Sequence, residues 1–380
     1  MIDLYVKNGR SISGEPIEIL IEYGKIKAVS KKFDNITARK ILDLKQSAYV
    51  SAGWIDDHVH CYEKLALYSD QPDLDGVTAG VTTVIDAGST GADNLADFYQ
   101  LASKAKTNVY AMCNISKTGI IAQDELGDLK RIQPQLVSET LAQYQKQFVV
   151  GIKARMSKSV VAGNGIVPLE RAKAIQRQNA GIPLMVHIGT NPPELSEIMA
   201  MLDPGDIITH CYNGKPNGIL DHELGQIKQF AIEAYQRGII FDVGHGTESF
   251  SFEVAQKAKE IGLAPQTISS DLYHRNRENG PVYNLATCLD KMYYLGYSLA
   301  ELIPMITSQP AANFKLMHKG HLAAGFDGDL TIFSIENQEK ILTDSNGYQV
   351  TTHRVFAPHY SVVGGTVYQT NMEVQHGEFV

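Results

Sequence analysis

Hydrophobic and polar residues follow two different rhythms along this chain of 380 residues. In residues 1–50 and again in 320–380, apolar and polar positions alternate around turn signals such as Asn8-Gly9 and Gly364-Gly365. This alternation predicts half-exposed β-hairpins. Between the two ends, short apolar runs alternate with stretches whose apolar residues recur every three or four positions, as in 95–105. That rhythm predicts strands and helices in turn, which is typical of a parallel sheet covered by helices.

The central part contains eight apolar runs that we predict as strands. They fall near residues 49–56, 81–86, 108–115, 148–153, 183–188, 206–211, 238–243 and 266–271. Because eight strands close a (β/α)8 TIM barrel, we expect an α/β fold with such a barrel at residues 51–319. Residues 1–50 and 320–380 then form one small β-sandwich domain built from both termini.

Composition and charge narrow the classes of function. The chain is 44% hydrophobic and 20% charged, with a net charge of −8, so it lacks the basic surface that nucleic-acid binding requires. The N-terminus lacks the apolar segment of a signal peptide, and no apolar run approaches the length of a membrane span. We therefore expect a cytoplasmic protein with no nucleic-acid partner and no membrane partner. The four cysteines are scattered without a C-x-x-C pair, so histidines and carboxylates would have to hold any metal.

Candidate chemistry begins at the end of the first barrel strand, in Asp56-Asp57-His58-Val59-His60. Residues i and i+2 of a strand point to the same side, so both histidines can chelate one cation, although such pairs also occur by chance. Four further polar residues strengthen the prediction, because each of them ends another predicted strand: Lys153, His187, His210 and Asp271. A barrel places its reactive residues at the C-terminal ends of its strands, so we expect all six side chains to meet at one mouth.

Lys153 is unusual in such a set, because an ammonium group repels cations. Burial lowers the pKa of a lysine, and the neutral amine can add carbon dioxide to become a carbamate with two anionic oxygens. Carbamylated Lys153 would then be a carboxylate-like ligand. The alternative is a structural lysine paired with Asp56 or Asp86.

In these six residues and their order along the sequence, the chain resembles the amidohydrolase superfamily, and the likeness extends over nearly its whole length. The order His-x-His, Lys, His, His, Asp on strands one, four, five, six and eight is similar to the binuclear-metal pattern of that superfamily, and segments 6–9 and 320–330 agree. The resemblance implies two divalent metal ions, zinc first among them, held by His58, His60, carbamylated Lys153, His187, His210 and Asp271. It also implies that a hydroxide bridging the two ions attacks a carbonyl group, while Asp271 accepts a proton and returns it to the leaving group.

Within the superfamily, segments 53–60, 151–156 and 210–214 look most like the amidohydrolase/deacetylase-type metallohydrolases, relatives of dihydroorotase that are sometimes labelled adenine deaminase. That likeness implies a small-molecule acyl substrate: an N-acyl D-amino acid derivative or an O-acetyl 2-hydroxy acid that loses its acyl group. The alternative is a cyclic-amide hydrolase of the dihydroorotase or hydantoinase kind. Deamination is less favoured, because the residues after His187 lack the glutamate typical of deaminases. A non-catalytic scaffold is least favoured, and a homo-oligomer is compatible with the resemblance.

Two more residues are candidates for contact with the substrate. Arg155 follows Lys153 by two positions and so lies on the same side of its strand, where its guanidinium can clamp a carboxylate. The alternative for Arg155 is a structural ion pair at the rim. His245 lies after the seventh predicted strand, where it can hydrogen-bond the acyl oxygen or the leaving group. We predict both as catalytic-site residues, together with Asp271 and Lys153.

Overall fold

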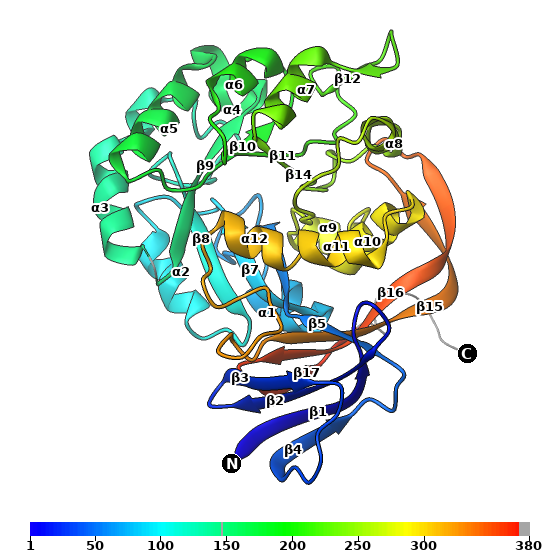
Figure 1. Cartoon of the computed structure of the whole chain (residues 1–380). Coiled ribbons are helices and arrows are strands. Elements are labelled where there is room, and N and C mark those ends of the chain that lie inside the picture. The colour runs from blue at the N-terminus through cyan, green and yellow to red at the C-terminus, as the bar shows by residue number, and fades with distance from the viewer. Residues whose placement is uncertain (146, 372–380) are drawn as a thin grey trace.

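Two large β-sheets organise the chain in the computed structural model, which describes residues 1–145 and 147–371 (Figure 1). The first is an eight-stranded mixed sheet in the order β17-β16-β15-β5-β1-β2-β3, with β4 paired to β1. Its strands are β1 (Ile2–Arg10), β2 (Pro16–Glu22), β3 (Lys25–Ser30), β4 (Ala38–Asp43), β5 (Tyr49–Ala52), β15 (Leu330–Thr343), β16 (Gln349–Val363) and β17 (Thr366–Gln369). Both termini therefore contribute to one sheet, as the alternating pattern predicted. Residues 372–380, the last part of the predicted terminal domain, lie outside the described residues.

The second sheet has seven parallel strands in the order β14-β11-β10-β9-β8-β7-β6. Its strands are β6 (Trp54–Val59), β7 (Val81–Ala87), β8 (Asn108–Asn114), β9 (Val149–Met156), β10 (Leu184–Ile188), β11 (Ile207–Thr209) and β14 (Ile240–Asp242). The run predicted at 49–56 is divided at Gly53, where the chain passes from the terminal sheet into the parallel sheet. A Cβ at Gly53 would lie 2.1 Å from Oγ1 of Thr82, so this crossing requires glycine.

The eighth predicted strand, 266–271, is not a regular strand in the structure. Isolated bridges join Asp242 to Thr267 on one side and Val59 to Leu272 on the other, so residues 267–272 contact both edges of the parallel sheet. Asp271 has a φ of 51°, a left-handed conformation that a regular strand does not contain. The structure thus shows a parallel, barrel-like sheet whose two edges meet across this segment.

The described residues also form twelve α-helices, several of which cover the outer face of the parallel sheet (Figure 1). They are α1 (Pro72–Asp75), α2 (Leu95–Ala102), α3 (Pro134–Tyr144), α4 (Lys158–Val161), α5 (Val167–Gln178), α6 (Leu195–Met201), α7 (Gln229–Gln236), α8 (Phe252–Glu260), α9 (His274–Asn279), α10 (Leu285–Tyr294), α11 (Leu299–Met305) and α12 (Ser308–Asn313). A short hairpin, β12 (Leu220–Asp221) and β13 (Gln226–Ile227), precedes α7. Among the described helices, none combines the length and the apolar character that crossing a membrane would need.

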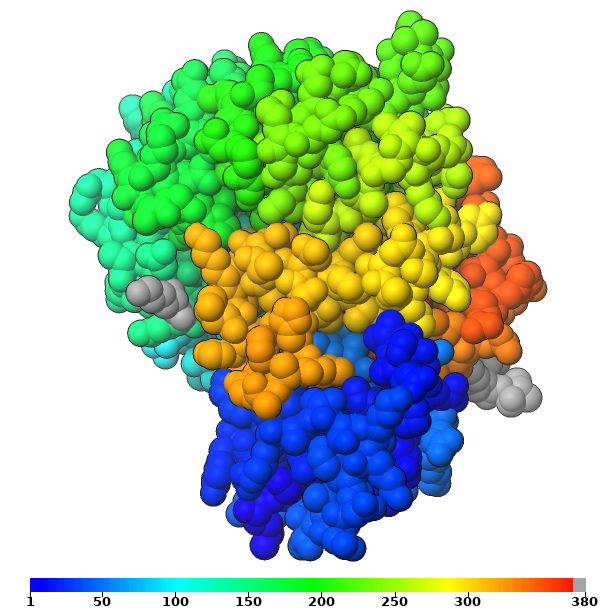
Figure 2. Space-filling model, viewed as in Figure 1, coloured from blue at the N-terminus to red at the C-terminus, as the bar shows by residue number. Residues whose placement is uncertain are grey.

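The long hairpin of β15 and β16 connects the terminal sheet to the barrel-like part. Figure 2 shows the N-terminal residues, in blue, gathered at one end of the molecule, while the hairpin, in orange to red, continues along its side. At the hairpin tip, the backbone N–H of Ser345 donates to the carbonyl of Phe250 over 2.9 Å, and Asp344 accepts from the backbone N–H of Phe252 over 3.1 Å. The terminal sheet therefore holds the loop that follows β14.

The interior of the parallel sheet is apolar below the strand ends. Its buried residues include Ile55, Ile85, Ala87, Met112, Met185 and Ile207. Met185 precedes His187 on β10, and Ile207 on β11 precedes His210, which follows directly after that strand. The apolar layer therefore closes the interior on one side, and the polar residues are collected on the other side, at the C-terminal ends of the strands.

Candidate metal centre

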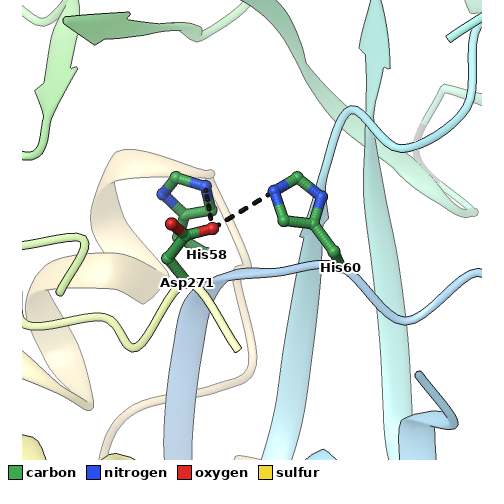
Figure 3. A group of neighbouring side chains, drawn as sticks. All are labelled: His58, His60 and Asp271. Atoms are coloured by element: carbon green, nitrogen blue, oxygen red, sulfur yellow. Dashed lines mark ion pairs between the residues drawn. The ribbon is translucent and has the colours of Figure 1, made fainter. Parts of the chain in front are cut away.

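Three side chains at the C-terminal end of the parallel sheet surround one small space: His58 and His60 from the end of β6, and Asp271 from the 267–272 segment (Figure 3). Oδ1 of Asp271 lies 3.3 Å from Nε2 of His58 and 3.2 Å from Nε2 of His60. The histidines are buried, whereas 18% of the Asp271 side chain is exposed, so the carboxylate is the most accessible of the three groups. The three residues together could hold a metal ion.

The far nitrogen of each imidazole is already engaged. Nδ1 of His58 lies 2.8 Å from the hydroxyl of Thr209, which itself donates to Asp242 over 2.6 Å. Thr209 must therefore accept from His58, so Nδ1 carries the proton and Nε2 keeps its lone pair. Nδ1 of His60 lies 2.8 Å from the hydroxyl of Ser89. Partners of this kind orient metal-binding histidines in proteins, and here they turn both Nε2 atoms toward Asp271.

The side-chain amine of Lys153 lies beside the same space. It is fully buried on β9, and its Nζ lies 3.2 Å from Nε2 of His58 and 3.2 Å from Sδ of Met185. Burial lowers the pKa of this amine to about 7. The alternative for Lys153 is a structural ion pair with Asp56 or Asp86, but both carboxylates have other partners. Asp56 accepts from the hydroxyl of Ser270, and Asp86 accepts from the backbone N–H groups of Cys61 and Ser89. The surroundings of Lys153 thus favour a neutral amine close to the candidate ligands.

His187 and His210 complete the group of predicted ligands. The ring of His210 lies 4.5 Å from that of His187 and 5.2 Å from that of His58, measured between centroids. Nδ1 of His210 donates to the carbonyl of Gly244 over 2.6 Å, which leaves Nε2 as its free nitrogen. His210 has a φ of 73°, a backbone strain of the kind that collects at functional sites. The structure therefore brings the six predicted residues together, while their roles as ligands of two ions stay predictions.

Burial also sets the protonation of these groups. It lowers the pKa of His58, His187 and His210, that of His210 to about 4. Burial by itself raises the pKa of Asp271, but the hydrogen bond from His60 and the nearby positive charge outweigh it, and the net pKa is lowered. Neutral imidazoles and an ionised carboxylate are the forms that bind divalent cations.

Arg155 lies near the site but is held by a carboxylate that the sequence analysis did not single out. Its Nε and one terminal nitrogen contact the two oxygens of Glu125 at 2.7 and 3.0 Å. Its guanidinium also lies 5.6 Å from the ring centre of Tyr68. Arg155 therefore forms a structural ion pair, which was the alternative to contact with the substrate. Its contact with a substrate stays a prediction. Glu125 lies thirty positions upstream of Arg155 in a loop, and no spacing rule links the two.

His245 is fully buried, and both of its ring nitrogens have partners inside the protein. Nδ1 lies 2.8 Å from the carbonyl of Gly246, and Nε2 lies 2.6 Å from Nζ of Lys291. The ring is stacked on Phe250 with centroids 4.7 Å apart. His245 is thus near the site but faces Lys291, and its predicted contact with the substrate is untested. Lys291, on α10, was not singled out by the sequence, because it lies on an amphipathic helix and ends no strand.

Aromatic side chains cover one side of the metal-binding group. The ring of Tyr68 lies 5.6 Å from that of His60 and packs edge-to-face on Tyr273 with centroids 5.0 Å apart. The hydroxyl of Tyr273 is 3.1 Å from that of Thr247. These tyrosines come from the loops after β6 and after Asp271, and their position on those loops was the only sequence signal for them.

Comparison with known proteins finds relatives that match nearly the whole length of the chain. A model described as a deacetylase-like composite domain matches residues 322–369. A deacetylase from Enterococcus faecalis is 54% identical over 366 residues, which cover 96% of this chain and 99% of that protein.

Solved structures agree on the family and differ in the substrate they are named for. One, described as an adenine deaminase, has a TM-score of 0.96 at 53% identity and covers 97% of this chain and 100% of its own. Another, described as a dihydroorotase, has a TM-score of 0.86 at 31% identity and covers 97% of this chain and 99% of its own. Identity at these levels over nearly complete chains shows common descent. The chain therefore belongs to the deacetylase-like family of the amidohydrolase superfamily.

Proposed function

We propose that this chain is a binuclear metal-dependent hydrolase that removes an acetyl or other small acyl group from an amide or an ester. The observation that carries the proposal is the meeting of His58, His60 and Asp271 at one point beside the buried amine of Lys153. The family supports it, since a relative of more than half identity is named a deacetylase. In this proposal, residues 267–272 serve as the eighth strand of a (β/α)8 barrel spanning 51–319, and residues 1–50 and 320–380 form a β-sandwich domain.

The donor set fits two divalent ions. His58 and His210 present unprotonated Nε2 atoms, because their Nδ1 protons are used by Thr209 and Gly244. Nitrogen and carboxylate ligands suit zinc, and manganese, iron and cobalt also accept them. The lowered pKa of Lys153 makes its amine available for carbamylation. We propose that one ion is held by His58, His60 and Asp271, the second by His187 and His210, and both by the Lys153 carbamate.

In the proposed reaction, Asp271 would carry the proton from water to the leaving group. When bound, two divalent ions supply an acidified water molecule and polarise the acyl carbonyl. Asp271, ionised and partly exposed, accepts the proton that water loses as it adds to the acyl carbon. The carbon–nitrogen or carbon–oxygen bond then breaks, and Asp271 returns the proton to the leaving amine or alcohol. The products are a carboxylic acid and the deacylated molecule.

The substrates we propose are N-acyl D-amino acid derivatives and O-acetyl 2-hydroxy acids, both of which carry a carboxylate beside the acyl group. Arg155 remains our candidate for that carboxylate. Because Glu125 occupies its Nε and Nη2, a substrate would have to use Nη1. In this arrangement Glu125 fixes the plane of the guanidinium, and Tyr68 packs against it.

A substrate panel tests the proposal. Zinc-loaded protein is offered N-acetyl-D-amino acids, N-acetyl-L-amino acids and acetylated 2-hydroxy acids, and acetate release is measured. We expect release from at least one class, and its loss together with the metal in Lys153→Ala. The matched control is Lys173→Ala: Lys173 is a buried lysine paired with Asp206 at the opposite end of the strands, so its loss should leave metal content unchanged. Full metal content and full rate in Lys153→Ala would sink the proposed bridge.

A cyclic-amide hydrolase is the second candidate, and its support is the likeness to a structure described as a dihydroorotase. The same residues would open a cyclic amide, because the bond broken is again carbon–nitrogen next to a carbonyl. Faster opening of dihydroorotate or a hydantoin than release of acetate would favour this candidate. Ammonia release from adenine would instead favour the activity for which another relative is named, and a metal-free, inactive protein would favour a scaffold.

A further inference from the structure

Lys291 is a buried cation that the proposed reaction does not use. It lies on α10 with none of its side chain exposed. Its Nζ lies 2.6 Å from Nε2 of His245, 2.9 Å from the carbonyl of Pro281 and 2.7 Å from the carbonyl of Thr343. These acceptors belong to three separate segments: the loop after β14, the loop after Asp271, and the end of β15. One amino group therefore joins two loops at the mouth to the hairpin of the terminal sheet.

The direction of these hydrogen bonds follows from their acceptors. A carbonyl only accepts, so Nδ1 of His245 must donate to Gly246 and carries the proton of the neutral ring. Nε2 then has a lone pair and accepts from Lys291. Lys291 consequently donates three hydrogen bonds, which is the full capacity of an ammonium group. The contact geometry thus indicates a charged lysine beside a neutral imidazole with a defined tautomer.

The residues on either side of His245 touch two of the candidate ligands. Gly244 accepts the Nδ1 proton of His210 over 2.6 Å. Gly246 packs so closely on Asp271 that a Cβ there would lie 2.4 Å from Oδ2 of the carboxylate. The backbone N–H of His245 donates to the carbonyl oxygen of Ser269, and that of Gly246 donates to the carbonyl oxygen of Ser270, each over 3.0 Å. The position of this short loop therefore sets the orientation of His210 and the space available to Asp271.

We propose that Lys291 is a positioning residue: its ammonium group holds His245 in the Nδ1-protonated form and thereby fixes residues 244–246 against His210 and Asp271. The effect of Lys291 on catalysis rests on the proposed metal centre. The attachment of residues 244–246 through His245 and Lys291 does not depend on it. Lys291 acts from behind His245 and touches neither the candidate ligands nor the space between them. It also makes the β15–β16 hairpin part of the support of the site, because Thr343 supplies one of its three acceptors.

A neighbouring lysine provides the matched control. Lys340, on β15, donates to Asp290 over 2.8 Å and to Thr287 over 3.1 Å. It is largely buried against the same helix as Lys291, but it does not contact the 244–246 loop among the described contacts. Removing Lys340 takes the cation away from the buried carboxylate of Asp290, which keeps its hydrogen bond from the backbone N–H of Phe356, and so costs stability. It should not change the orientation of His210 or Asp271.

The first test measures metal binding and turnover in Lys291→Met and Lys340→Met. We expect Lys291→Met to lower metal affinity in chelator competition, or kcat, by about 10- to 100-fold, the loss usually found when a supporting partner of a metal ligand is removed. KM should change far less than kcat, because substrate contacts are intact. Lys340→Met should lower the melting temperature without lowering metal affinity. Unchanged metal affinity and kcat in folded Lys291→Met, or equal losses in both variants, would overturn the proposal.

The second test does not depend on a variant that folds or on an acyl substrate. Nitrogen-15 NMR of the metal-free wild-type protein reports the tautomer of each histidine ring, and His245→Gln assigns the signal of His245. We expect a neutral ring protonated at Nδ1 whose Nε2 accepts a hydrogen bond. A ring protonated at Nε2, or at both nitrogens, would overturn the anchoring. If no acyl substrate is cleaved while this signal and the metal loss of Lys291→Met are found, the proposed function fails and the inference stands.

Discussion

Carbamylation of Lys153 can be tested by assembling the metal centre with and without carbon dioxide. The perturbation is complete removal of metal and dissolved carbon dioxide, followed by addition of zinc at a fixed concentration of dissolved carbon dioxide between pH 6 and pH 9. Recovery of metal retention and of acetate release is followed in time. Because only the neutral amine reacts with carbon dioxide, the initial rate should follow the neutral fraction of Lys153.

The size of the effect follows from burial. Burial lowers the pKa of Lys153 to about 7, so about half of the molecules carry a neutral amine at pH 7. A lysine with its ordinary pKa of about 10.4 would be neutral in about 0.04% of molecules at that pH. With a pKa of about 7, the neutral fraction rises from about 9% at pH 6 to about 91% at pH 8, a tenfold change that levels off. A lysine with an ordinary pKa would instead gain a further tenfold with each pH unit.

The assay separates these cases directly. Carbon-13-labelled bicarbonate should give a carbamate signal in the wild-type protein and none in Lys153→Met. Recovery that needs no carbon dioxide, or a rate that keeps rising tenfold per pH unit through pH 9, would refute the reasoning from burial.

Three further predictions follow from individual contacts. Gly246→Ala should abolish most activity, because its Cβ would meet Asp271 at 2.4 Å. The control for backbone strain is Gly165→Ala, because Gly165 has a φ of 52° against 51° at Gly246 and a Cβ there would have nothing within 4 Å; equal activity in both variants would contradict the steric argument. In metal-free protein without carbon dioxide, the free energy of unfolding should rise between pH 7 and pH 9 by about 2 kcal/mol more in wild type than in Lys153→Met, because burial lowers the pKa of Lys153 to about 7 and the unfolded chain then binds more protons. Urea titrations of both proteins measure this difference, and an equal rise in both would refute it. Glu125→Gln should raise KM more than it lowers kcat, because the guanidinium group of Arg155 loses the carboxylate that fixes its orientation. Steady-state kinetics measures both constants, and an unchanged KM would argue against contact between Arg155 and the carboxylate of the substrate.

The regular parts of the fold were predictable because their signals are local. Seven of the runs predicted as strands coincide with strands, since short apolar runs between polar turns reflect burial on both faces of a parallel sheet. The division at Gly53 was not predictable, because the residues on both sides are apolar and only the close approach of Thr82 explains the crossing. The irregular backbone of the eighth segment, with the left-handed Asp271 at its end, was not predictable, because the local sequence does not reveal a left-handed residue.

The candidate site was predictable where residues end strands and hidden where they pair across the chain. His58, His60, Lys153, His187, His210 and Asp271 meet because parallel strands end on the same side of a sheet. The partners of Arg155 and His245 could not be derived in this way. Glu125 lies in a loop and Lys291 on a helix, and each meets its partner only through the tertiary fold. Local patterns thus predict the reactive groups, while packing decides what holds them.

Anomalous diffraction from zinc-loaded crystals is the most direct measurement of the central claim. We expect two anomalous peaks, one among His58, His60 and Asp271 and the other between His187 and His210, with carbamate density on Lys153 between them. Crystals that bind zinc elsewhere, or that show Lys153 as a free amine beside a single ion, would contradict it.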